Sequence, residues 1–150
     1  MTAHGRWTRH RAREAALQIL YYWEVGRVDV EQAVATYWAN QDDEPPSGRL
    51  QAFASDLARR TVAERERIDP LITAGAEHWR LSRMAVIDRL IIRMAVAELL
   101  TDATAQPGIV IDEALELAKT FSTDDSVKFI NGVLDGIHRR LAAEGPAGPA

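Results

Sequence analysis

The side chains best suited to binding chemistry are four arginines gathered in the first 13 residues. This segment, MTAHGRWTRHRAR, carries a formal charge of +4 and contains no acid, whereas the other 137 residues hold 14 basic and 22 acidic groups. Guanidinium groups bind phosphate oxygens and stack on unpaired bases. A basic segment on an acidic body favours a local anionic partner. A solvated terminal charge run is the alternative that the composition leaves open.

No motif for catalysis or for a cofactor accompanies these arginines. The sequence contains no cysteine, which excludes disulfides, thiolate metal sites and a cysteine nucleophile. The four histidines lack the spacing of metal ligands, and there is no glycine-rich phosphate loop or nucleophile elbow. We therefore expect a binding protein and not an enzyme, with no catalytic residue, no cofactor and no metal site.

Apolar residues recur at spacings of three and four along most of the chain, which predicts an all-α fold of about seven helices. A length of 150 residues fits one domain. We expect a flexible basic arm at 1–8, a helical domain at 9–141 and a flexible tail at 142–150. The expected helices cover 12–25, 29–38, 49 to near 68, 70–79, 81–100, 109–121 and a last segment that ends near 141.

Particular residues set the expected ends of these helices. Gly26 suits a helix C-cap, Asp29 suits an N-cap, and Pro70 suits the first turn of a new helix. Segment 81–100 is apolar on nearly every face, so it should lie in the middle of the bundle. Gly132 within the last helix suggests close approach by a neighbouring element.

No run is long and apolar enough for a membrane helix or a secretory signal, so we expect a cytoplasmic protein with no membrane partner.

Three blocks of sequence form a long and specific pattern. The first is RHRARE at 9–14 with LYYW at 20–23, and the second is WRL at 79–81 with DR at 88–89 and IRMA at 92–95. The third is IDEALELAKTF at 111–121 with SVKFINGVLD at 126–135. In order and spacing they closely resemble the NusB family of transcription antitermination factors. The resemblance implies a helical bundle of two subdomains that binds boxA RNA of ribosomal RNA leaders together with NusE, a small-subunit ribosomal protein. The resemblance further implies that the protein and NusE act together within an RNA polymerase complex that contains other Nus factors.

The resemblance also implies which residues bind. For RNA it indicates Arg9, His10, Arg11, Arg13, Tyr21, Asp125 and Phe129. Gln18, two turns along the same helix, is added as a residue that could bind base edges, with a solvated helix face as the alternative. For NusE it indicates Tyr21, Asp88 and Arg89. His10 stands where arginine is common in the family, which should weaken RNA binding and make it sensitive to pH.

Several assignments stay open at this point. By burial statistics alone Phe129 is a core aromatic. The candidate N-caps of the last helix are Ser122, Thr123, Asp124 and Asp125, and the two aspartates could instead contact the ligand. Of Tyr21 and Tyr22, we expect one to pack in the core and the other, Tyr21, to face the ligand. An RNA-binding module in ribosomal RNA maturation and a helical protein–protein adaptor without RNA affinity are the alternative functions. Monomer and homodimer are both compatible with the sequence.

Overall fold

The computed structural model describes residues 7–42, 44–76 and 81–144, and its α-helices confirm the predicted all-α fold. The chain divides into two compact units, Met1–Ala63 and Glu64–Ala150. The first unit contains α1 (Arg9–Gly26), α2 (Val30–Ala39) and α3 (Gly48–Ala63). The second contains α4 (Arg65–Gly75), the 3-10 helix η1 (Leu81–Arg83), α5 (Val86–Thr101), α6 (Pro107–Phe121) and α7 (Asp124–Ala143). Most of the predicted arm, the end of the tail and His78 lie outside the described residues.

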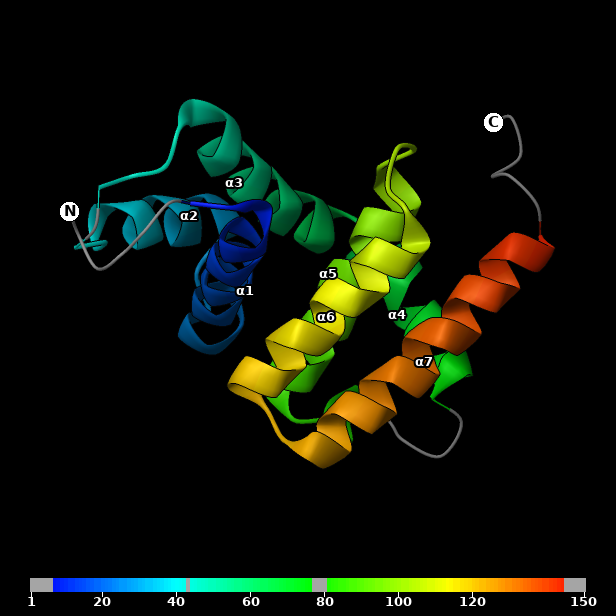
Figure 1. Ribbon diagram of the computed structural model, residues 1–150. Coiled ribbons are helices and arrows are strands. Elements are labelled where there is room, and N and C mark those ends of the chain that lie inside the picture. The colour runs from blue at the N-terminus through cyan, green and yellow to red at the C-terminus, as the bar shows by residue number, and fades with distance from the viewer. Residues whose placement is uncertain (1–6, 43, 77–80, 145–150) are drawn as a thin grey trace. The chain divides into compact units, whose positions relative to one another are not determined.

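In the first unit, α1 packs against both α2 and α3 (Figure 1). Its buried face combines alanines that allow close approach with larger side chains, among them Leu17, Ile19 and Leu20. Thr8 caps the helix, because its hydroxyl accepts a hydrogen bond from the backbone N–H of Arg11 at 3.1 Å. The cap places the arginines of the basic segment in the first turns of a regular helix.

Polar contacts join α2 to α3. Asp29 caps α2 as predicted, and its carboxylate accepts from the Gln32 N–H at 2.8 Å. Arg59 of α3 donates two hydrogen bonds to Glu31 of α2, at 2.8 and 3.0 Å, and a third to Asp56. The hydrogen bonds to Glu31 are the main cause that raises the pKa of Arg59.

In the second unit, α5 contacts α4, α6 and α7 (Figure 1), which confirms the central position predicted from its apolar character. All residues from Leu90 to Ala97 are buried. One of them, Arg93, forms a two-pronged ion pair with Asp69 of α4 at 2.9 and 3.0 Å. This pair offsets the cost of placing a charge in the interior.

Some predicted helix boundaries were wrong. The expected break at Pro70 lies instead at Glu64, and Pro70 sits inside α4 as its sixth residue. The helices divide at Glu64, since α3 packs within the first unit and α4 packs within the second. Pro70 has no N–H, so α4 lacks one internal hydrogen bond there. The expected helix at 81–100 begins only at Val86, after the turn η1.

Two glycine predictions were also wrong. Gly26 is the last residue of α1, and the left-handed cap conformation belongs to Arg27, with φ 54° and ψ 42°. A Cβ placed on Gly132 would meet no atom within 4 Å, so no element approaches it closely. The close approach occurs at Gly75 of α4, where a Cβ would lie 3.2 Å from Cγ1 of Ile137 on α7.

Candidate nucleic-acid interface

In the first unit, three arginines at the start of α1 lie against aromatic rings. The Cζ atom of Arg9 lies 4.5 Å from the centroid of the Phe53 ring on α3, and that of Arg13 lies 5.3 Å from the same centroid. Arg11 lies over the Trp7 ring at 4.1 Å. Arg9 is exposed, whereas Arg13 is only 6% exposed. Arg9 is thus placed to meet a ligand, while the guanidinium of Arg13 lies within the fold.

Trp7 precedes the helix and is itself held in place. Its indole N–H donates to the backbone carbonyl of Glu44 at 3.3 Å, and its ring centroid lies 5.7 Å from that of Trp38. Trp38 in turn donates to the Ser55 hydroxyl at 2.9 Å. The part of the predicted arm next to α1 therefore has specific contacts within the first unit. Sequence reasoning missed Phe53 and Trp7 as partners of the arginines, since nothing in their local pattern indicates a contact between distant segments.

Further along α1, polar and aromatic residues follow one another on one face, at positions 10, 14, 18 and 21. His10 Nε2 lies 3.4 Å from a carboxylate oxygen of Glu14, and Gln18 is exposed. Tyr21 and Tyr22 are each 43% exposed, so the expectation that one of them packs in the core was wrong. This face presents hydrogen-bonding groups and aromatic rings together.

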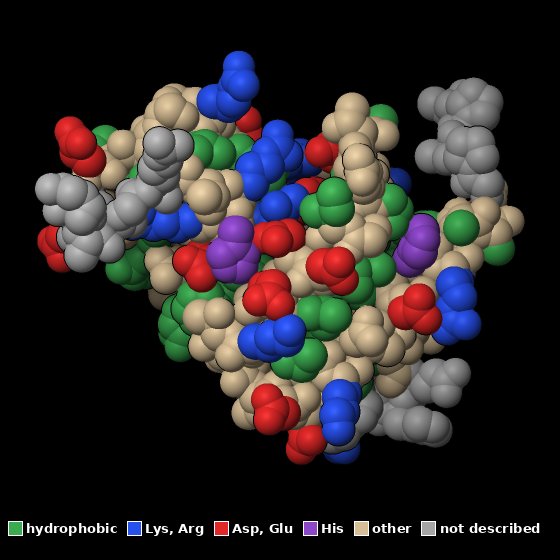
Figure 2. Space-filling model, viewed as in Figure 1, with side chains coloured by type: hydrophobic (Ala, Val, Ile, Leu, Met, Phe, Trp, Pro, Cys, Tyr) green, Lys and Arg blue, Asp and Glu red, His purple; other side chains and the backbone are tan. Residues whose placement is uncertain are grey.

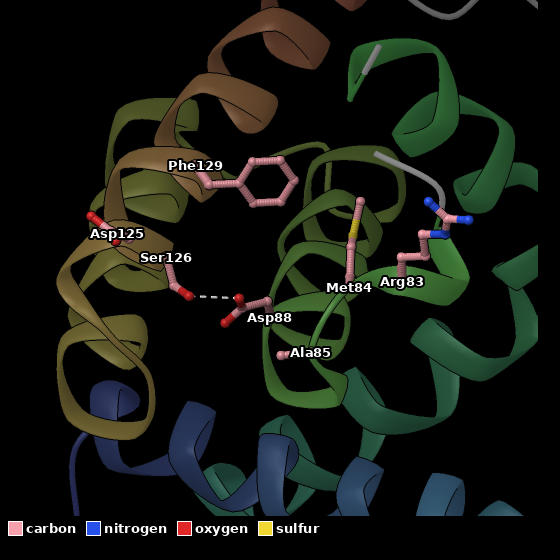
Figure 3. A pocket seen from close by; sticks show the side chains of 7 residues that line it. All are labelled: Arg83, Met84, Ala85, Asp88, Asp125, Ser126 and Phe129. Atoms are coloured by element: carbon pink, nitrogen blue, oxygen red, sulfur yellow. Dashed lines mark hydrogen bonds between the residues drawn. The ribbon is translucent and has the colours of Figure 1, made fainter. Parts of the chain in front are cut away.

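In the second unit, a pocket of about 350 Å³ lies beside the start of α7. It is lined by Arg83, Met84, Ala85, Asp88, Asp125, Ser126 and Phe129, and we call it the Phe129 pocket. Figure 3 shows the Phe129 ring directed from α7 into the pocket, toward Met84. Phe129 is half-buried and is absent from the buried core. The core assignment suggested by burial statistics was therefore wrong, and the ring is accessible to a ligand.

Asp88 lies at the base of this pocket and is 7% exposed. Its two carboxylate oxygens accept hydrogen bonds from the hydroxyls of Ser122 and Ser126, both at 2.6 Å (Figure 3 shows the second). Arg89 donates to the backbone carbonyls of Leu81 and Met84, at 3.3 and 3.4 Å. Both residues thus bind groups of their own unit, and their contact with NusE stays a prediction.

The first turn of α7 carries the aspartates that were candidate caps. Of the candidate caps, the N-cap is Thr123, whose hydroxyl accepts from the Ser126 N–H at 3.1 Å, and neither aspartate caps the helix. Asp124 and Asp125 instead lie in the first turn and are exposed. Their negative charges suit the helix N-terminus, and Asp125 also lines the Phe129 pocket.

The outer faces of α6 and α7 have mixed charge. Figure 2 shows acidic and basic side chains interspersed along these helices. Glu116 and Lys119 pair at 2.9 Å on α6, and Asp135 and Arg139 pair at 3.2 Å on α7.

Within the described ranges, no group of three or more potential ligands is placed to hold a metal ion. Nor does any helix of that part of the chain have the length and hydropathy needed to cross a membrane.

Comparison with known proteins agrees with this arrangement. Residues 10–139 match the NusB family. The chain is 45% identical to the transcription antitermination protein NusB of Solibacter usitatus, over 89% of this chain and 90% of that protein. It is 43% identical to NusB of Koribacter versatilis, over 91% and 92% of the two chains.

Solved structures show the same fold. T. maritima NusB aligns with a TM-score of 0.81 and 34% identity, over 90% of this chain and 93% of that one. A chain from the crystal structure of antitermination factors NusB and NusE in complex with dsRNA aligns with a TM-score of 0.78 and 26% identity, over 89% and 99%. The family match and the identity to these relatives extend over nearly the whole sequence, and the chain belongs to the NusB family.

Proposed function

We propose that this protein is an antitermination factor that binds boxA-type single-stranded leader RNA of ribosomal RNA operons together with NusE. It thereby supports processive elongation by RNA polymerase in a complex with other Nus factors. It acts by binding and not by catalysis, in the cytoplasm, where bacterial transcription takes place. The observation that carries the proposal is the exposed guanidinium of Arg9 at the capped start of α1, in a chain whose relatives are named as antitermination proteins.

On α1, the exposed and half-buried groups have distinct roles in the proposal. Arg9 and Arg11 neutralise phosphates, because a guanidinium forms paired hydrogen bonds with phosphate oxygens. His10 adds a positive charge when protonated. Gln18 can bind base edges, and the exposed ring of Tyr21 can stack on an unpaired base. The burial of Arg13 argues against its direct contact with RNA.

In the second unit, the Phe129 pocket supplies a second RNA-binding element. A half-buried aromatic ring beside Met84 offers an apolar platform for one base, which is a sequence-tolerant contact. The exposed carboxylate of Asp125 lies at the pocket and repels phosphate, which limits affinity. For NusE we propose contacts with Tyr21 of the first unit and, separately, with Arg89 of the second unit, where Asp88 holds the start of α7 against α5.

The test is the binding of a boxA RNA and a scrambled control, with and without NusE, at two salt concentrations. We expect preference for boxA, strengthening by NusE, and a fall of log affinity with log salt. The slope should be about −1.4 for the two phosphates neutralised by Arg9 and Arg11, and about −2 when His10 is also protonated. A double-stranded boxA probe is included, since a related NusB was crystallised with dsRNA. Sequence-specific binding unaffected by NusE would favour a role in ribosomal RNA maturation. Absent or sequence-independent binding would favour a protein–protein adaptor and refute the proposal.

A further inference from the structure

We propose that Phe53, on α3, is a positioning residue that holds the guanidinium of Arg9 ready for an RNA phosphate. The inference rests on the proposed RNA-binding function and adds a residue that makes no direct contact of its own with RNA. The Phe53 ring is half-buried, and the Arg9 Cζ atom lies over it at 4.5 Å from the centroid. A distance below about 6 Å is that of an attractive cation–π contact.

This contact leaves the hydrogen-bonding capacity of Arg9 available. The ring quadrupole attracts the positive charge, and the five N–H donors of a guanidinium lie in its plane. Within the part of the chain that the structure describes, Arg9 has no hydrogen bond or ion pair. Its donors can therefore form the paired hydrogen bonds that a phosphate accepts.

Arg13 adds a second positive charge at the same ring. It lies one helical turn after Arg9, 5.3 Å from the Phe53 centroid, and is almost fully buried. The negative face of the ring attracts both guanidinium groups. Two arginines thus share the Phe53 ring, and of these two only Arg9 is exposed.

The position of the ring is itself determined by the fold. Residues next to Phe53 on α3, including Ala54 and Leu57, are fully buried, and α3 packs against α1. Because the ring is held by this packing, it restricts the rotamers of Arg9 before RNA arrives. An arginine without such a contact loses more side-chain entropy on binding, so removal of the ring should lower RNA affinity even where the fold is unchanged.

The experiment compares Phe53→Leu and Phe53→Met, which keep apolar volume but remove the ring, with Phe53→Tyr, which keeps the ring. The probe is a boxA-containing single-stranded RNA oligonucleotide. We expect the Phe53→Leu and Phe53→Met variants to bind the RNA about two- to five-fold more weakly than the wild type. The Phe53→Tyr variant should keep wild-type affinity. In the Leu and Met variants, the slope of log affinity against log salt concentration should become shallower by about 0.7 if one phosphate contact is lost. Phe121→Leu, at another half-buried phenylalanine, is the matched control and should leave affinity unchanged.

Arg9→Ala and the double variant Arg9→Ala/Phe53→Leu separate this inference from the proposed function. We expect the loss of Arg9 to weaken binding, and the further loss of Phe53 to add little, because both changes remove the same phosphate contact. If Arg9→Ala weakens binding but neither Phe53→Leu nor Phe53→Met does, the positioning role is overturned and the RNA-binding function stands. If Arg9→Ala leaves binding unchanged, the assignment of Arg9 to RNA is itself wrong. Equal losses with Leu, Met and Tyr that follow the melting temperature would show a purely structural role and also overturn the inference.

Discussion

Asp88 provides the sharpest test of how the second unit is held together. The carboxylate is 7% exposed and accepts hydroxyl hydrogen bonds from Ser122 and Ser126, both at 2.6 Å. We expect Asp88→Ala to destabilise the protein, because it removes two charge-assisted bonds that join α5 to the C-cap of α6 and to the start of α7. Such bonds contribute about 1.5–3 kcal/mol each, and both serines are half-buried. Taking the lower value for each bond, the expected loss is about 3 kcal/mol.

For a chain of this size, that loss corresponds to a fall in melting temperature of about 6–12 °C. The assay is thermal and urea unfolding followed by circular dichroism. Asp88→Asn should cost about half as much, since the amide keeps one acceptor oxygen. Asp112→Ala removes an exposed carboxylate on α6 and should change stability by less than about 0.5 kcal/mol.

The same variants separate a structural role of Asp88 from direct contact with NusE. If the carboxylate acts inside the unit, loss of NusE affinity in Asp88→Ala should parallel the loss of stability and be smaller in Asp88→Asn. Unchanged stability together with a large loss of NusE affinity would refute the reasoning. A double-mutant cycle with Ser126→Ala gives the coupling directly, and we expect a coupling energy of at least about 1 kcal/mol.

Three further predictions concern single residues. Arg27→Gly should stabilise the protein by about 0.5–1 kcal/mol in urea unfolding, because Arg27 has φ 54° and glycine adopts that conformation without a Cβ clash; a loss of stability would contradict this. Gly132→Ala should add about 0.5–1 kcal/mol to the unfolding free energy, since the Cβ meets no atom and alanine favours the helix; unchanged or lower stability would argue against it. Asp125→Asn should raise the affinity for boxA RNA, because it removes an exposed negative charge from the Phe129 pocket. The gain should be larger at low salt than at high salt. A lower affinity in filter binding would show that the carboxylate accepts a hydrogen bond from the RNA.

Features that depend on local spacing were predicted well. The helical period correctly indicated most of α1, α2 and α6, and the Asp29 cap followed from residue type alone. The central position of α5 followed from its apolar faces. The break between α3 and α4 was misplaced, because Pro70 is a strong local signal whereas Glu64 is an ordinary helix former. Packing into two separate units decides that boundary, and no local pattern encodes it.

The candidate site divides in the same way. Charge and spacing singled out Arg9, Arg11 and Arg13, but they could not indicate that two of these arginines share the ring of Phe53. Nor could they distinguish the exposed Arg9 from the buried Arg13. For Phe129, burial statistics favoured the core, whereas its ring is half-buried and lines a pocket beside α7; its contact with RNA stays a prediction.

By itself, the sequence determined the helical class, the family and the presence of a basic segment at the start of the first helix. These properties depend on residue type and on spacing along the chain, which are local. Only the tertiary structure decided which arginine faces solvent, which ring it rests on, and which groups Asp88 binds. Such contacts join segments far apart in the chain, and they form because each unit must bury its own apolar faces and pair its own buried charges.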